Sequence, residues 1–194
     1  MRLTDGEFRA MNSPLRRFFQ RYVEFPLFRR AGLRQRNQDV LEIGCGSGYG
    51  AMLLARLHPK SFVGIDVMPE QIDLAKARCN LPNCEFLVMD ASDLGSFPAS
   101  SKDVVVIFGI LHHVSQWRKV LSECHRVLRT GGKLFLEEPG GAAVKLWDKL
   151  FKWNHPEQAL FGFKELESQL QTSGFIIARK IPVFPFGIYC AEKT

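Results

Sequence analysis

Short apolar runs alternate with amphipathic stretches along most of the chain. Runs rich in Val, Ile and Phe predict strands over residues 39–43, 61–66, 84–89, 103–108, 133–137, 175–181 and 186–192. Apolar positions at helical spacing predict helices from the turn after 43 to about 57, and over 69–79, 116–128 and 164–172. This alternation predicts an α/β fold with a doubly wound, mostly parallel sheet. The short link at 183–185 predicts an antiparallel last strand.

The N-terminal segment, residues 1–36, reads as a helical unit of its own. Ser13 and Pro14 are typical of an N-cap and a first helical position. The helix after them is expected to gather its apolar residues on one face, Leu15, Phe18, Phe19, Tyr22 and Val23, and to turn Arg16, Arg17 and Arg21 the other way. Pro26 is expected to break or kink it.

The net charge of +6 lies entirely in this segment, where nine Arg oppose Asp5, Glu7 and Glu24. Such a segment is either a solvated helix face or an attractive surface for an anionic partner. The five Cys lack the paired spacing of a zinc site, so no metal is expected. A polar N-terminus and the lack of a stretch of about 18 apolar residues favour a cytoplasmic protein.

A glycine-rich turn, Gly44, Gly46 and Gly48, follows the first predicted strand. Glycines there permit positive φ and close approach of a ligand to the backbone, although such a turn alone is weak evidence. Glu42 stands two residues ahead, where a carboxylate would repel a pyrophosphate and attract an ammonium or sulfonium. Asp66, at the end of the second predicted strand, is placed to accept hydrogen bonds from a ribose diol.

A nicotinamide-dependent oxidoreductase remains an alternative at this point. Counted from Gly44, the G-x-G-x-x-G fingerprint fails at Tyr49. The looser G-x-G-x-x-A does occur at Gly46, Gly48 and Ala51.

The run from Glu42 to Gly48, EIGCGSG, resembles the E-x-G-x-G-x-G first motif of the class I, Rossmann-like S-adenosylmethionine-dependent methyltransferases. The segments 63–77, 86–94, 103–114 and 127–139 resemble that family's later motifs in order, so the resemblance covers about residues 39–192. It implies a seven-stranded sheet in the order 3-2-1-4-5-7-6, with S-adenosyl-L-methionine as co-substrate. It also implies a methyltransferase domain over 37–194, with an insertion at 140–163.

The resemblance assigns donor-binding roles residue by residue. Asp66 matches the ribose-binding acid, Val67 and Met68 the residues beside the adenine, and Asp90 and Ala91 the acid and amide that bind it. Alternatively, Asp66, Asp90 or Asp93 simply caps a turn. The full expected set is Glu42, Gly44, Cys45, Gly46, Gly48, Asp66, Val67, Met68, Asp90, Ala91 and Phe108.

Methyl transfer from a sulfonium mainly needs proximity and in-line geometry in a water-poor cleft. A base is required only if the acceptor must lose a proton, and the candidates are His112 and His113, just past the fourth predicted strand. Adjacent residues cannot both face the ligand, so one would line the donor pocket while the other packs. A purely structural pair is the alternative. His58, His125 and His155 have no motif context.

The acceptor side favours a small molecule. After the fourth strand the chain reads Phe108-Gly109-Ile110-Leu111, without the Asn/Asp-Pro-Pro-aromatic run of the family's nucleic-acid amino-methylating members. It resembles members that methylate small molecules, including lipid and quinone-type acceptors. RNA, given the basic N-terminus, and a catalytically silent donor-binding module remain alternatives.

Two segments are expected to form a lid or cap: residues 1–36 and 140–163. The second interleaves Trp147, Leu150, Phe151 and Trp153 with Lys145, Lys149 and Lys152. We expect this lid to cover a hydrophobic or anionic acceptor, with peripheral contact to an anionic membrane. The alternative is that it only covers the core. Nothing in the sequence distinguishes a monomer from a dimer.

Overall fold

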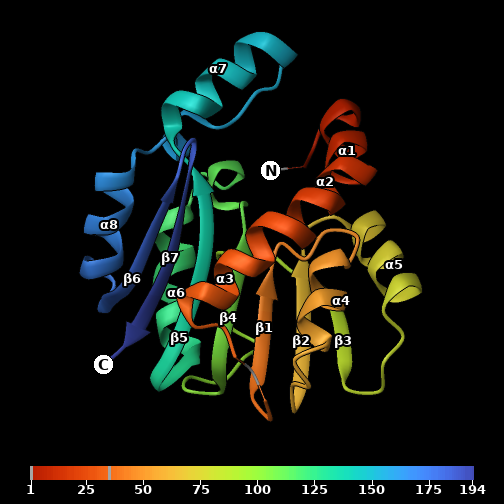
Figure 1. Ribbon diagram of the computed structural model, residues 1–194, viewed down its shortest axis with the longest axis vertical. Coiled ribbons are helices and arrows are strands. Elements are labelled where there is room, and N and C mark those ends of the chain that lie inside the picture. The colour runs from red at the N-terminus through yellow and green to blue at the C-terminus, as the bar shows by residue number, and fades with distance from the viewer. Residues whose placement is uncertain (1, 35) are drawn as a thin grey trace.

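The computed structural model describes residues 2–34 and 36–194. A seven-stranded sheet forms its centre, in the order β3-β2-β1-β4-β5-β7-β6 (Figure 1). The strands are β1 (Asp39–Ile43), β2 (Ser61–Asp66), β3 (Cys84–Val88), β4 (Lys102–Phe108), β5 (Leu128–Pro139), β6 (Phe175–Val183) and β7 (Phe186–Lys193). Strands β1 to β5 pair in parallel, and β7 is antiparallel to both neighbours. The predicted fold class, strand order and antiparallel last strand are confirmed.

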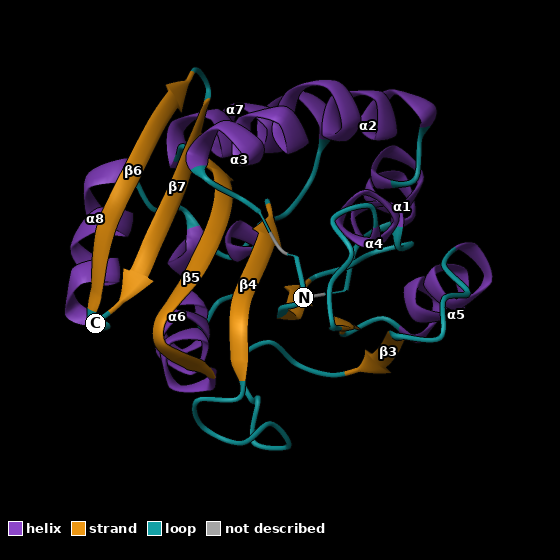
Figure 2. Ribbon diagram, turned by 60° about the horizontal axis from the view of Figure 1, so that its bottom comes forward, coloured by secondary structure: helices purple, strands orange, loops and turns teal. Residues whose placement is uncertain are grey.

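Helices cover both faces of the sheet (Figures 1 and 2). One face carries α3 (Phe25–Ala31), α4 (Tyr49–Ala55) and α5 (Pro69–Arg78), and the other carries α6 (Trp117–Val127) and α8 (Phe163–Thr172). Because strand side chains alternate between faces, β4 serves two cores. Val104 and Val106 join the core beneath α3 to α5, whereas Val105 and Ile107 join the core beneath α6 and α8.

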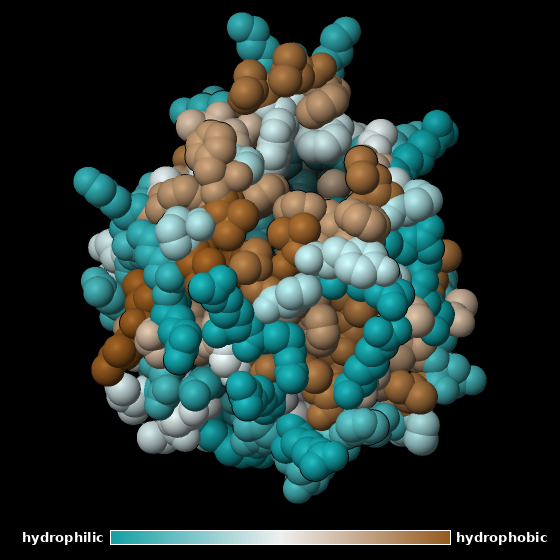
Figure 3. Space-filling model, viewed as in Figure 1, coloured by the Kyte–Doolittle hydropathy of each residue, from teal (hydrophilic) through white to brown (hydrophobic). Residues whose placement is uncertain are grey.

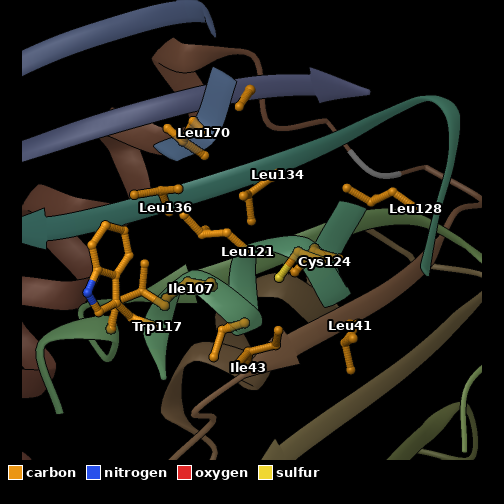
Figure 4. Close-up of a cluster of buried hydrophobic side chains, with 14 of the residues drawn as sticks. Leu41, Ile43, Ile107, Trp117, Leu121, Cys124, Leu128, Leu134, Leu136 and Leu170 are labelled. Carbon is orange, nitrogen blue, oxygen red and sulfur yellow. The ribbon is translucent and has the colours of Figure 1, made fainter. Parts of the chain in front are cut away.

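The core beneath α6 and α8 is shown in Figure 4. Trp117, Leu121 and Cys124 of α6 lie against strand residues, and Leu170 closes the cluster from α8. Each is fully buried, and burying a side chain of Leu size contributes about 1.5–3 kcal/mol. The indole Nε1 of Trp117 donates to the Gln158 carbonyl at 2.9 Å, which ties the segment after α7 to the same core.

The N-terminal segment forms α1 (Asp5–Met11), α2 (Pro14–Phe19), the π-helical turn η1 (Gln20–Glu24) and α3. Ser13 caps α2 as predicted, since its hydroxyl accepts from the Arg16 amide at 3.2 Å. Of the two outcomes expected at Pro26, a break or a kink, the break does not occur, because the chain stays helical through it. A π-helical turn precedes this proline, and in it the Phe25 amide donates to the Gln20 carbonyl five residues earlier. This turn lets the helix continue through Pro26, which has no amide hydrogen to donate.

The face that this helix turns inward differs in part from the prediction: Arg16 lies inward, whereas Arg21 is exposed as predicted. The outward residues include much of the expected apolar face: Leu15, Phe18 and Tyr22, each more than half exposed. Gln20 and Glu24 are buried instead, one and two turns after Arg16, whose guanidinium pairs with Glu24 at 2.8 Å. The helix lies over polar strand ends, so a buried ion pair takes the place that apolar periodicity would assign to Leu and Phe.

The 140–163 segment contains α7 (Gly141–Phe151) and a 3-10 turn, η3 (Glu157–Ala159). Strand β5 starts at Leu128 instead of 133, because Leu128 already pairs with Lys102 of β4. The segment with Gly131 and Gly132 forms an irregularity in the ladder, and regular pairing resumes where Lys133 meets Val104. Among the described residues, no helix is both long and apolar enough to cross a membrane. Met1 and Gln35, which fall in the predicted 1–36 segment, lie outside the described residues.

Candidate functional site

A cavity of about 200 Å³ lies where β1, β2 and β4 end and the N-terminal helices cross above them. The carboxyl ends of parallel strands meet at one edge, where open α/β sheets bind ligands. All of the predicted donor-binding residues line the cavity except Gly48. The structure therefore brings the predicted set together, while its role in binding stays a prediction.

The three glycines of the turn, all at positive φ, do different things. A Cβ on Gly44 would lie 2.4 Å from Cγ2 of Ile110, and one on Gly48 would lie 2.8 Å from Cα of Ala75. Those two glycines let the turn pack against neighbouring segments. A Cβ on Gly46 would meet nothing within 4 Å, and this residue lines the cavity. Gly46 therefore leaves the backbone open to close approach from the cavity side.

Glu42 lies at the base of the cavity with a side chain that is almost completely buried. Burial, with the nearby charge of Asp66, raises the pKa of its carboxyl well above the ordinary value. Its Oε2 is buried and has no hydrogen-bond partner within residues 2–34 and 36–194. Gly50 makes room for the other oxygen, because a Cβ at that position would lie 2.0 Å from Oε1. This is a desolvated carboxyl group facing a cavity, and a cation bound beside it would favour its ionised form.

Asp66 joins the glycine turn to the start of α5. Its Oδ2 accepts from the Gly46 amide at 3.0 Å, and its Oδ1 accepts from the Met68 amide at 2.9 Å. Burial raises the pKa of this carboxyl, although both amide bonds oppose the rise. Each carboxylate oxygen keeps a second lone pair, so Asp66 can fix the turn and still accept from hydroxyls in the cavity.

Asp90 combines the two roles that the sequence left open. Its Oδ1 accepts from the amide and from the hydroxyl of Ser92, both at 2.7 Å, which is a turn cap. Burial pushes the pKa of Asp90 upward, but the Ser92 hydrogen bonds outweigh it and hold the pKa below its ordinary value. Asp90 also lines the cavity, as does Ala91. Asp93 caps Gly95 at 3.2 Å and is not among the lining residues.

The two adjacent histidines face different surroundings in the 3-10 turn η2 (Leu111–His113). His113 lines the cavity. His112 does not, because its Nδ1 pairs with Oε2 of buried Glu138 at 2.8 Å. The other oxygen of Glu138 accepts from the amides of Ile110 and Leu111, so this one carboxylate holds the whole turn. Burial lowers the pKa of His112 to about 3 and that of His113 well below its ordinary value, which keeps both rings neutral.

Part of the cavity wall was not predicted. The N-terminal helices and the segment before them contribute Leu3, Met11, Arg16 and Gln20. Apolar periodicity placed Arg16 on the outer face and gave Gln20 no role. A sign of their position was present in the sequence: Arg16, Gln20 and Glu24 recur every four residues and form a polar stripe along one helix face.

Comparison with known proteins agrees with this geometry. A family model described as a methyltransferase domain matches residues 41–136. A probable S-adenosylmethionine-dependent methyltransferase of Mycolicibacterium smegmatis is 31% identical over 159 residues, which cover 81% of this chain and 60% of that protein. The chain belongs to the class I S-adenosylmethionine-dependent methyltransferase family.

One further curated relative and one solved structure also resemble this methyltransferase. The phthiotriol/phenolphthiotriol dimycocerosates methyltransferase of Mycobacterium leprae is 43% identical over 96 residues, covering 49% of this chain and 35% of that protein. The structure of a methyltransferase from Methanosarcina mazei superposes with a TM-score of 0.69 at 27% identity, covering 87% and 97% of the two chains. The chain thus spans 60% or less of the two mycobacterial relatives' lengths. Family membership leaves the nicotinamide-dependent oxidoreductase without support.

Substitution of Gly50 tests the placement of Glu42 independently of any ligand. Alanine is normally the better residue in a helix, but here its Cβ would overlap the Glu42 carboxylate. We expect Gly50→Ala to lower the free energy of unfolding in urea by about 1–3 kcal/mol. Gly6→Ala, in helix α1 with nothing within 4 Å of the added Cβ, is the control and should raise it by up to about 1 kcal/mol. Equal or greater stability of Gly50→Ala would contradict the described contact.

Proposed function

We propose that the protein transfers the methyl group of S-adenosyl-L-methionine directly to a hydrophobic small-molecule acceptor. The observation that carries the donor assignment is the buried, unpartnered Oε2 of Glu42 at the base of the cavity. An ammonium or sulfonium placed there would offset the cost of desolvating this carboxylate. Asp66, across the glycine turn from Glu42, would then bind the ribose hydroxyls.

The remaining donor contacts follow from the cavity wall. Val67 and Met68 would flank the adenine, and Asp90, whose Oδ1 is occupied by Ser92, would use Oδ2 for the adenine amino group. The open side of Gly46 would allow the amino-acid part of the donor to lie against the backbone. Together these groups would hold the donor in one orientation, which the in-line reaction requires.

The sulfonium supplies an already activated methyl group, so the protein has to place an acceptor opposite it and exclude water. His113 is the candidate base for an acceptor that must lose a proton, because it lines the cavity and its ring is neutral. His112, held by Glu138, would act as a positioning residue for the turn that carries His113.

A hydrophobic acceptor is supported by the outer surface above the cavity. Exposed apolar side chains gather on α2, η1, α7 and the β6–β7 turn: Leu15, Phe18, Tyr22, Leu146, Leu150, Phe151 and Phe184. Brown, hydrophobic atoms are accordingly prominent at the top of Figure 3, over α7. Phe186 contacts both Phe19 of α2 and Trp147 of α7, so both helices approach the start of β7.

The same surface carries the charge that an anionic membrane attracts. Arg21 and Lys149 lie exposed on η1 and α7, beside these apolar groups. Exposed apolar side chains interleaved with basic residues are typical of segments that lie in a lipid interface. The name of the leprae relative also states a lipid substrate class for that protein. We therefore propose that α2 and α7 form a lid that takes its acceptor from such a surface. Neither the fold nor the relatives support RNA as the acceptor.

The donor assignment predicts a defined loss at Asp66. Asp66→Ala should weaken binding of S-adenosylhomocysteine, measured by calorimetry, at least tenfold, because hydrogen bonds to a charged group contribute about 1.5–3 kcal/mol. Asp93→Ala, which removes a carboxylate outside the cavity, is the matched control and should bind as the wild type does. If Asp66→Ala keeps full affinity, the ribose assignment is wrong.

The acceptor assignment is tested with labelled donor and vesicles. Methyl label from S-adenosylmethionine should enter the lipid fraction of a cell extract, and the protein should float with anionic phosphatidylglycerol vesicles. The double variant Phe18→Ser, Phe151→Ser should reduce flotation several-fold. Ile176→Ser, an equally exposed apolar side chain near the start of β6, should not change it. No flotation by the wild type, with labelling of a soluble polar acceptor, contradicts the proposal. No labelling of any acceptor would favour a silent donor-binding module.

A further inference from the structure

Two adjacent histidines and a third that is distant in sequence converge beside the cavity. His112 and His113 belong to η2, and His155 comes from the segment between α7 and η3. Their ring centroids lie 4.2 Å (112–113), 4.5 Å (113–155) and 5.2 Å (112–155) apart. One ring nitrogen from each lies within 4.8 Å of the other two. No sequence motif connects them, because α6, β5 and α7 separate His155 from His113.

Acidic side chains orient two of the three rings. Nδ1 of His112 lies 2.8 Å from Oε2 of Glu138, and Nδ1 of His155 lies 2.5 Å from Oδ1 of Asp148. With the carboxylates as acceptors, each Nδ1 carries the proton and each Nε2 presents its lone pair. Carboxylate–histidine pairs of this kind orient the imidazole ligands of protein-bound metals.

A fourth group points into the same place. Glu7 of α1 uses Oε2 to accept from the Thr4 amide in the helix cap, which leaves its buried Oε1 for another partner. That Oε1 lies 3.8 Å from Nε2 of His155, and neither atom has a hydrogen-bond partner in the described part of the chain. Two unsatisfied polar atoms, both nine-tenths buried or more, therefore face each other within the cluster.

We propose that His112, His113 and His155, with Glu7, form a binding site for a first-row divalent cation such as Zn²⁺. Imidazoles and one carboxylate are a typical zinc donor set. Zn–N bonds of about 2.0–2.1 Å place tetrahedral ligands roughly 3.4 Å apart. The nitrogens, now within 4.8 Å of one another, would move together by up to about 1.4 Å on binding.

The bound cation would connect the two lid segments to the catalytic turn. Glu7 brings α1, His155 and Asp148 bring α7 and the segment after it, and His113 lines the donor cavity. Because α1, the segment after α7 and the turn η2 would each supply a ligand to one ion, binding would hold these segments together above the cavity. The site does not depend on donor binding, since its ligands can be tested without donor or acceptor. While the ion is bound, His113 is a ligand, so it acts as the proposed base only in the metal-free protein.

The test uses untagged, chelator-treated protein titrated with Zn²⁺ in a calorimeter and with Co²⁺ in a spectrophotometer. We expect one equivalent of each to bind, with a Co²⁺ spectrum of nitrogen and oxygen ligands. His155→Ala should weaken binding at least tenfold, and Asp148→Asn should weaken it about 10–100-fold by removing the orienting carboxylate. His58→Asn, an exposed histidine outside the cluster, should bind as the wild type does.

A second readout follows the lid: proteolytic cleavage within 152–156 should slow when Zn²⁺ is added to the wild type but not to Asp148→Asn. The proposal is overturned if the wild type binds no Zn²⁺ at micromolar concentration, or if Co²⁺ shows thiolate charge-transfer bands, which would place the ion on cysteine. It is also overturned if Asp148→Asn binds as tightly as the wild type. This last comparison decides the matter even where His155→Ala does not fold.

Discussion

A buried carboxylate at the end of β1 imposes the main constraint on this molecule. Glu42 is removed from water, and its pKa is raised by that burial. Two glycines leave space around its side chain. Gly50 lacks a Cβ that would overlap the carboxyl group, and Gly46 leaves the adjacent backbone accessible from the cavity. Such a group is costly unless a cation compensates it. The cavity, the glycine turn and the covering helix α2 are all arranged around that requirement.

The sheet and the donor side of the cavity could be predicted because local patterns determine them. Apolar runs such as the one in β4 are buried on both faces, and the turn glycines need conformations that few other residues adopt. The cap at Ser13 was predictable for the same reason, since Ser followed by Pro specifies a helix start within two residues.

The covering segments could not be predicted, because their orientation depends on what they cover. Periodicity assumes that an apolar face turns inward, yet α2 lies above polar strand ends and presents Arg16 and Gln20 to them. Leu15 and Phe18 are consequently exposed. Likewise, no local sequence pattern marks His155, because it meets His112 and His113 only in the folded chain.

The segments whose orientation could not be predicted, the N-terminal helices and residues 140–163, also carry the proposed acceptor surface and the proposed cation site. The exposed apolar residues and the histidine cluster share α7 and its following segment, so acceptor entry and cation binding would act on the same lid. The donor side is different: its residues sit on strand ends and the first turns of helices, which are held by the two cores. A proposed donor site held by both cores, beneath the proposed lid, would suit an enzyme that must admit a bulky acceptor and then exclude water.

The claim that Glu42 recognises the positive charge of the donor is tested most directly by comparing two ligands. S-adenosylhomocysteine carries the amino-acid group, whereas 5′-methylthioadenosine retains the nucleoside and lacks that group. Calorimetry should show that Glu42→Gln loses at least tenfold in affinity for S-adenosylhomocysteine while binding 5′-methylthioadenosine as the wild type does. Equal losses for both ligands, or no loss for either, would contradict the account.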